Sequence, residues 1–200
     1  GLSLHYGERC AVDGLDFSVQ KGENFGLLGP NGAGKTSTLA CLTGLVDGWK
    51  GRIVLDGRQA RPAQDPDIRR GIGLVPQDLA VYEELTAREN LEFFGGLAGL
   101  AGAELSDAAG RGLALSGLED RADDRVDKFS GGMKRRLNLA IGDVHRPPLL
   151  LLDEPTVGVD PQSRNHIFDT LEKLAEEGRT LIYTTHYMEE AQRLCDRILI

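Results

Sequence analysis

The chain has 200 residues, a length that suits one domain with a substantial core. Its net charge of −8 argues against a nucleic-acid-binding surface, and its three cysteines, odd in number and without metal-ligand spacing, argue against a disulfide framework or a zinc site. The longest uncharged stretch, residues 93–103, is well short of the roughly 20 apolar residues that a membrane helix requires.

The first quarter of the sequence predicts strands around a glycine-rich loop. A helix should begin near Lys35 and end at Gly44, and the pair Asp56-Gly57 should close a turn. Alternation or short apolar runs predict strands at residues 1–4, 15–19, 25–28 and 52–55.

The middle of the sequence is helical in character. Thr86 and Glu89 form a capping box ahead of an apolar helix. Ser106 is a candidate cap for a second helix, and Ser130 for a third that reaches about His145.

The last quarter alternates strands with helices. Residues 149–152 are uniformly apolar, as in a strand buried on both faces, and residues 180–184 resemble them. Asp160 should cap a helix that Gly178 ends, and residues 188–195 should form a last short helix.

These elements predict an α/β fold, and the Walker A pattern of residues 29–36, described next, makes it one of the P-loop NTPase type. Its core should be a mostly parallel sheet covered on both faces, preceded by an antiparallel β part. We expect one domain over residues 1–200, with residues 86–145 as an inserted helical subdomain. Residues 1–4 and 197–200 both read as strands in progress, so we expect the chain to be an excerpt of a longer protein.

Residues 29–36, GPNGAGKT, match the Walker A pattern between an apolar strand and a helix. Glycines let backbone N–H groups point at phosphate oxygens, and the helix directs its positive end at the same anion. Lys35 should pair with the β- and γ-phosphates and Thr36 should offer its hydroxyl to Mg²⁺. The residues expected to hold the phosphates are Asn31, Gly32, Ala33, Gly34, Lys35, Thr36 and Ser37. The alternative, a chance glycine-rich turn, is disfavoured by the strand–helix setting.

Asp153 and Glu154 follow the buried strand of residues 149–152. They should therefore lie at the carboxyl edge of the sheet, where α/β proteins bind ligands. We expect Asp153 to orient Mg²⁺ and Glu154 to act on the attacking water. Taken alone, the pair is equally compatible with a strand end that turns into solvent.

Residues 130–134, SGGMK, predict a second anion-binding helix start in the same chain, formed by Ser130, Gly131 and Gly132. This segment resembles the signature motif of the ABC ATPases, and the resemblance extends over essentially all 200 residues. In that family the segment reaches the γ-phosphate held by a partner domain.

The resemblance implies roles for four further residues. Tyr6 matches the aromatic side chain that stacks on adenine, and Gln77 matches the residue that senses Mg²⁺ and faces the transmembrane partner. Asp160 matches the loop that links two active sites, and His186 matches the switch histidine at the γ-phosphate. Each has a structural alternative: a strand aromatic, a loop amide, a helix cap and a structural histidine.

The chain departs from the commonest family pattern at four positions, Phe129, Met133, Val157 and Val159. None of them supplies a group that touches phosphate or metal. The signature form and residues 185–191 resemble the drug, antibiotic and lipid exporter subgroup, often called ABC-2 type.

The resemblance implies a Mg²⁺-dependent ATPase that drives a separate transmembrane permease from the cytoplasmic face of the membrane. Two copies, or this chain and a related one, should form a head-to-tail dimer around two ATP, without nucleic acid. The alternatives are a soluble ABC ATPase of translation or DNA maintenance and the energising subunit of an importer. The long insertions of the DNA-maintenance relatives are absent between Thr38 and Phe129.

Overall fold

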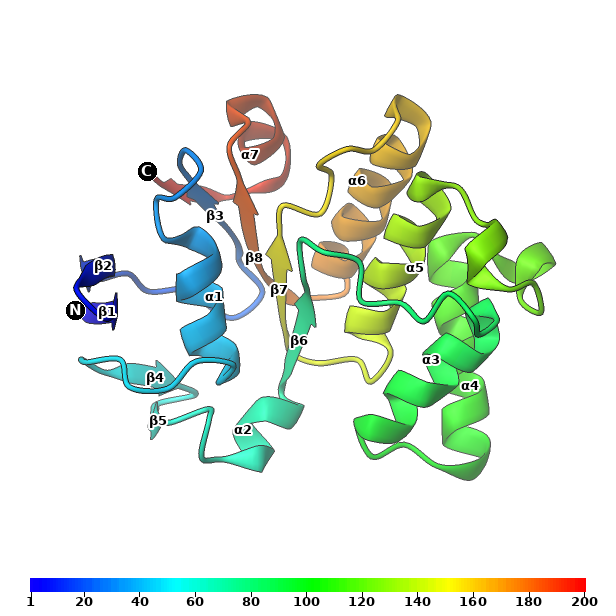
Figure 1. The fold of residues 1–200 in the computed structure, drawn as a ribbon, viewed down its shortest axis with the longest axis horizontal. Coiled ribbons are helices and arrows are strands. Elements are labelled where there is room, and N and C mark those ends of the chain that lie inside the picture. Colours follow the sequence, from blue (N-terminus) through cyan, green and yellow to red (C-terminus); the bar gives the residue numbers. More distant parts are fainter.

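The computed structural model describes residues 1–200 and contains nine strands and seven α-helices (Figure 1). The strands are β1 (Leu2–Tyr6), β2 (Arg9–Leu15), β3 (Asn24–Leu28), β4 (Ile53–Leu55), β5 (Arg58–Ala60), β6 (Ile72–Val75), β7 (Leu149–Asp153), β8 (Thr180–Thr185) and β9 (Arg197–Leu199). The helices are α1 (Lys35–Thr43), α2 (Pro66–Arg70), α3 (Ala87–Leu97), α4 (Gly102–Ser116), α5 (Gly131–Asp143), α6 (Pro161–Glu176) and α7 (Met188–Leu194).

The centre of the molecule is a five-stranded sheet in the order β6-β7-β8-β3-β9, with every pair parallel. Alternate residues of β7 enter different apolar clusters. Leu151 packs with Leu39 and Cys41 of α1, whereas Leu150 packs with Ile167 of α6. Helices therefore cover both faces of the sheet, which confirms the predicted α/β class and explains why β7 is apolar throughout.

An antiparallel part precedes and flanks this sheet, at the left of Figure 1. β1 pairs with β2, and β4 pairs with β5 across the predicted Asp56-Gly57 turn. Leu4, Val12 and Ile53 from these strands share the apolar cluster of α1, so the hairpins extend the core beyond the sheet. The N-terminal antiparallel part of the predicted fold is confirmed.

The predicted strand at residues 15–19 is wrong. β2 ends at Leu15, and the chain then runs irregularly to Lys21. The ring of Phe17 stacks on that of Phe25, with 5.2 Å between the ring centroids, and Val19 packs on the apolar cluster that contains Phe25. These contacts partly bury every second side chain of the segment. Alternating burial here comes from contact with the core and not from pairing in a sheet.

The helices α3, α4 and α5 gather beside the sheet and bury an apolar cluster of their own, from Ala87 to Val144. The capping box at Thr86 is present, but α4 begins at Gly102 and not at Ser106, which lies inside the helix. The link from α3 turns at Gly99 and Gly102, both with positive φ. This tight turn starts α4 early and sets it against α3, so packing and not a capping side chain decides where the helix begins.

None of the seven helices combines the length and the apolar character that crossing a membrane requires.

Candidate functional site

The loop between β3 and α1 is shaped to receive an anion. Gly32 and Gly34 have φ of +85° and +91°, a conformation that other residues rarely adopt. A Cβ on Gly34 would lie 2.4 Å from the carbonyl oxygen of Ala11, so β2 also excludes a side chain there. α1 starts without a capping side chain, and its first backbone N–H groups are open to a ligand.

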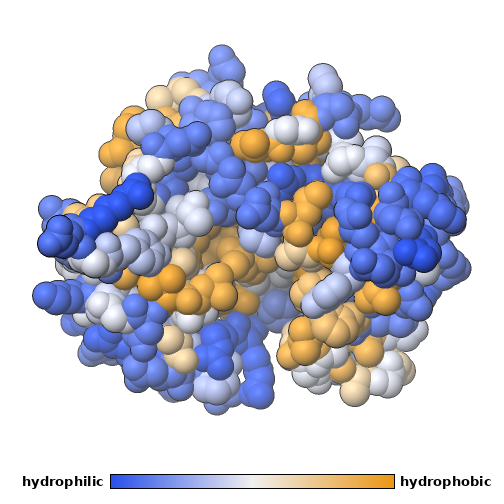
Figure 2. All heavy atoms as spheres, viewed as in Figure 1, coloured by the Kyte–Doolittle hydropathy of each residue, from blue (hydrophilic) through white to orange (hydrophobic).

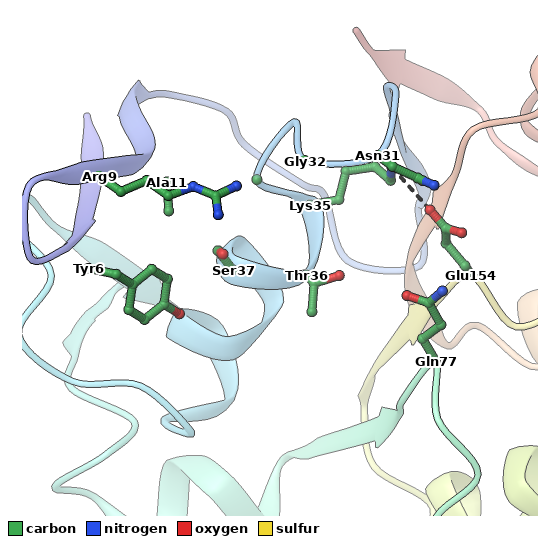
Figure 3. Close-up of a pocket in the computed structure, with 11 residues that line it drawn as sticks. Tyr6, Arg9, Ala11, Asn31, Gly32, Lys35, Thr36, Ser37, Gln77 and Glu154 are labelled. Carbon is green, nitrogen blue, oxygen red and sulfur yellow. Dashed lines mark ion pairs between the residues drawn. The ribbon is translucent and has the colours of Figure 1, made fainter.

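A cavity of about 350 Å³ opens over this loop (Figure 3). Its walls come from the β1–β2 hairpin, the loop and first turn of α1, and the ends of β6 and β7. The lining residues are Tyr6, Arg9, Ala11, Asn31, Gly32, Gly34, Lys35, Thr36, Ser37, Gln77 and Glu154. The structure thus brings most of the expected phosphate-loop residues together with Tyr6, Gln77 and Glu154.

Lys35 and Glu154, which line the cavity, form a network with His186, which lies outside the lining residues. The Nζ of Lys35 lies 3.1 Å from Oε1 of Glu154 and donates to the Gly29 carbonyl at 2.7 Å. Oε2 of Glu154 lies 3.1 Å from Nδ1 of His186. Lys35 and Glu154 are 8% and 5% exposed, so each needs the other as a partner in a poorly solvated setting.

The backbone of Glu154 is held in an uncommon conformation. Its φ is +46°, in the left-handed region that a residue with a long side chain seldom adopts. Its N–H donates to the side chain and the carbonyl of Thr184, at 3.0 and 3.2 Å. The neighbouring strand β8 therefore turns the Glu154 carboxylate toward Lys35.

Asp153 lies behind this network at the end of β7. It is 4% exposed, and its Oδ1 accepts a hydrogen bond of 2.7 Å from Thr184 Oγ1. It is outside the residues that line the cavity.

The donors available to a magnesium ion are few. No group of three or more His, Cys, Asp or Glu side chains is placed to hold a metal. Thr36, Gln77 and Asp153 offer a hydroxyl, an amide oxygen and a carboxylate. These oxygen donors suit Mg²⁺ that takes its remaining ligands from phosphate and water.

The loop that carries Gln77 is attached to helix α5. Arg135 donates to the carbonyl oxygen of Gln77 at 2.6 Å and to that of Val157 at 3.4 Å. Asn138 donates to Pro76 O and accepts from Ala80 N. Sequence reasoning passed over Arg135 and Asn138, because nothing in the helical pattern of α5 signals that these side chains reach back to residues 76–80.

The start of α5 does not line the cavity. Ser130 caps the helix by accepting from Met133 N at 3.2 Å, and both Ser130 and Gly131 are exposed. Gly132 is buried against Asp160, and a Cβ there would lie 2.0 Å from Ser163 Oγ. Asp160 caps α6, and the backbone N–H of Ser163 lowers the pKa of its carboxyl.

Two cavity residues, Arg9 and Ala11, were missed by sequence reasoning. Tyr6 and Arg9 pair across the β1–β2 turn, and Figure 3 shows both side chains at the outer end of the cavity. Gly7, with φ of +61°, allows the two-residue turn. The turn signal Gly7-Glu8 between two polar-rich strands could have identified Arg9 as the partner of Tyr6.

The phosphate-type loop and the two acidic residues at the end of β7 define a P-loop NTPase, and the start of α5 is a second glycine-containing helix start. The chain belongs to the ABC transporter family, whose model matches residues 12–157. It is 50% identical over 193 residues to the linearmycin resistance ATP-binding protein LnrL of Bacillus subtilis (strain 168), an alignment that covers 96% of this chain and 62% of that protein. It is 44% identical over 195 residues to the Nod factor export ATP-binding protein I of Cupriavidus metallidurans, covering 98% and 64%.

Solved structures agree with this assignment. The dimeric post-hydrolysis state of the ATP-binding cassette MJ0796, bound to ADP and Pi, superposes with a TM-score of 0.85 at 29% identity, covering 98% of this chain and 89% of that one. An ATP-binding subunit of an ABC transporter gives 0.85 at 31% identity, covering 99% and 83%. The chain spans 62% and 64% of the length of the two curated relatives named above.

Proposed function

We propose that this protein binds ATP in the cavity over the Gly29–Ser37 loop and hydrolyses it with Mg²⁺, as the energising subunit of an exporter. The observation that carries the proposal is the buried ion pair of Lys35 and Glu154, with the half-buried His186 on the other oxygen of Glu154, beside the uncapped start of α1. The Lys35 ammonium and the open N–H groups of the helix would donate to a phosphate group there, and the Glu154 carboxylate beside them can accept a proton from water.

In this proposal three side chains act at the γ-phosphate. Hydrolysis joins a water oxygen to the γ-phosphorus and breaks its bond to the oxygen that leaves with ADP. Glu154 orients the water and accepts its proton, Lys35 neutralises phosphate charge, and His186 holds the phosphoryl group that is transferred. The contact between Glu154 and His186 at 3.1 Å supports their joint action.

Tyr6 stacks on the adenine at the outer end of the cavity, where it is 49% exposed beside Arg9. Mg²⁺, when bound, would supply positive charge that offsets the charge of the phosphates. Thr36 and Gln77, which line the cavity, and Asp153, which accepts a hydrogen bond from Thr184, would be the residues that hold it.

We further propose a head-to-tail dimer, of two copies or of this chain and a related one. The N-terminus of α5, where Ser130 and Gly131 are exposed and the buried Gly132 follows, would bind an anion, and no phosphate loop of its own chain lines a shared cavity with it. Asp160 packs against Gly132 and connects this end to the segment after Glu154. The dimeric relative with ADP and Pi supports this arrangement.

The proposed permease contact lies near Gln77. Figure 2 shows apolar side chains gathered on the surface of the helical part, beside a hollow in the molecule. Large apolar side chains exposed between 38% and 71% follow Gln77 in the chain: Leu79, Tyr82, Phe93 and Leu97. An exposed apolar group of this kind suits a protein partner. Relatives named for linearmycin resistance and Nod factor export support an export role at the cytoplasmic face of the membrane.

We also propose that residues 1–200 form a single ABC ATPase domain, with residues 86–145 as its inserted helical subdomain. The separate apolar cluster of α3, α4 and α5 supports that division.

The test uses Glu154→Gln, which keeps the shape of the side chain and removes its charge. With Mg²⁺ and excess ATP this variant should hydrolyse about 10²- to 10⁴-fold more slowly than the wild type, because the proton acceptor is lost, and should accumulate as a dimer. Light scattering coupled to gel filtration measures the dimer. The matched control adds Lys35→Ala, which should abolish dimer formation, and ADP in place of ATP should leave monomers. A strictly monomeric Glu154→Gln protein at saturating ATP would contradict the proposal.

A further inference from the structure

A buried carboxylate on α7 lies directly behind the proposed catalytic residues. Glu190 is 6% exposed, and its partners are three hydroxyl groups rather than a cation. Thr156 Oγ1 donates at 2.8 and 2.9 Å to its two oxygens, and Tyr183 OH and Thr185 Oγ1 each donate at 2.9 Å to Oε2. A buried carboxylate without a cation depends on hydrogen-bond donors to offset its lost solvation. The Glu190 carboxylate therefore holds all three hydroxyl groups in place.

The phenol of Tyr183 remains a donor in this setting. Burial first, and then the negative charge of Glu190, raise the pKa of Tyr183 well above its ordinary value. Its ring belongs to the apolar cluster under β7 and β8. The carboxylate is therefore fixed from below by a side chain that cannot move without disturbing the core.

The other two hydroxyls belong to the segments that carry Glu154 and His186. Thr156 is two residues beyond Glu154, which itself has the left-handed backbone conformation described above. Thr185 directly precedes His186, and its Oγ1 also accepts from Tyr187 N at 3.0 Å. The hydrogen bonds of Glu190 thus hold the backbone on both sides of His186 and tie it to the turn after Glu154.

The segment that Glu190 holds also reaches the phosphate loop. The carbonyl oxygen of Thr185 accepts from Gly29 N at 3.3 Å, at the first residue of that loop. Glu190 does not line the cavity, and its hydrogen bonds go to neither Lys35 nor Glu154. Its influence on the site must act through Thr156 and Thr185.

We propose that Glu190 is a positioning residue for ATP hydrolysis, holding Glu154 and His186 at their mutual distance from behind the site. This inference rests on the proposed function. The carboxylate sets the relative position of two segments that come from different strands, and a strained residue such as Glu154 keeps its conformation only where its surroundings determine it.

The test compares Glu190→Gln with Glu189→Gln, a matched change one residue earlier on the exposed face of the same helix. The amide introduced by Glu190→Gln places an N–H₂ group against hydroxyls that now donate to a carboxylate. We expect kcat to fall about tenfold or more while the Kd for ATP stays within about twofold, because the phosphate loop is unchanged. Glu189→Gln should keep wild-type kcat and KM. Tyr183→Phe, which removes one donor and keeps the ring, should lower kcat by about two- to fivefold.

An unchanged kcat in folded Glu190→Gln would overturn the inference, and so would a lower melting temperature with an unchanged rate per folded molecule. If Glu190→Gln does not fold, Tyr183→Phe and Thr185→Val decide, and wild-type kcat in both would overturn it. An inactive wild-type protein would instead refute the proposed ATPase, whereas an active wild type beside equally active Glu190 and Tyr183 variants would refute the role of Glu190 alone.

Discussion

The phosphate loop and the start of α5 are both glycine-containing helix beginnings, yet the structure treats them in opposite ways. At the first, Lys35 is buried and joined to Glu154, and His186 completes a network drawn from three elements. At the second, Ser130 is exposed and its side chain only caps its own helix. One end is surrounded by partners within the chain, and the other faces solvent.

The difference teaches that two similar helix starts can have opposite surroundings, because only one of them carries buried charges. Buried charges at the phosphate loop require partners, because an unpaired buried ion is costly, and the chain provides them. The N-terminus of α5 carries only the partial charge of a helix end, which water satisfies at little cost. It can therefore remain exposed, and in the proposed dimer it would meet the phosphate held by the other chain.

Mixing two defective proteins gives the largest effect and tests this comparison directly. Ser130→Ala and Glu154→Gln should each be nearly inactive alone. In a head-to-tail heterodimer one site carries both changes and the other carries none. Because half of the dimers in an equal mixture are heterodimers with one intact site, ATPase activity should recover to about a quarter of the wild-type rate.

The control for mixing is each variant alone at the total protein concentration of the mixture, which should stay inactive. Activity of the mixture no greater than the sum of its parts would show that Ser130 serves the phosphate loop of its own chain.

A change at Tyr6, which lies at the exposed edge of the cavity over the phosphate loop, should have an intermediate effect on ATP hydrolysis. Stacking on a base is worth ~1–3 kcal/mol, so Tyr6→Ala should raise KM for ATP by about tenfold while kcat changes little. Tyr6→Phe keeps the ring and should retain the wild-type KM. Steady-state kinetics on the three proteins distinguishes the cases, and an unchanged KM in Tyr6→Ala would leave Tyr6 a structural residue of the hairpin.

A change at Asp143, at the C-terminal end of α5, should have the smallest effect, and only on the free energy of unfolding. Asp143 is 9% exposed, and Arg179 lies 3.4 Å away but donates its hydrogen bond to Pro147 O. Burial raises the pKa of the Asp143 carboxyl to about 6. The folded state therefore binds this proton more tightly than the unfolded state does. The stability that protonated Asp143 contributes is present below the pKa of the unfolded state and is lost as the pH rises through the folded-state pKa of about 6.

Urea unfolding of the wild type and of Asp143→Asn at pH 5 and pH 7.5 measures this. The free energy of unfolding of the wild type, relative to the variant, should drop by ~1–2 kcal/mol between the two pH values. Ser130→Ala serves as the comparison at the exposed end, because losing a cap costs ~1 kcal/mol with no pH dependence. A constant difference between wild type and Asp143→Asn would contradict the raised pKa.

The sequence by itself determined those helices and strands whose signals lie within a few neighbouring residues. The glycines of the phosphate loop, the capping box at Thr86 and the caps Ser130 and Asp160 identified helix starts, because these signals act within four residues. The apolar run of β7 identified a strand buried on both faces. The order of these elements was sufficient for the α/β class and for the candidate phosphate site.

Tertiary structure decided what depends on neighbours that are distant in sequence. Phe17 alternates like a strand residue but packs without one, and the turn at Gly99 moved the start of α4 away from Ser106. Arg135 and Glu190 acquire their contacts only once strands and helices are assembled. Periodicity records which face of an element is buried, whereas a charged or hydroxyl side chain finds its partner through the packing of whole elements, and that information is absent from any short window of sequence.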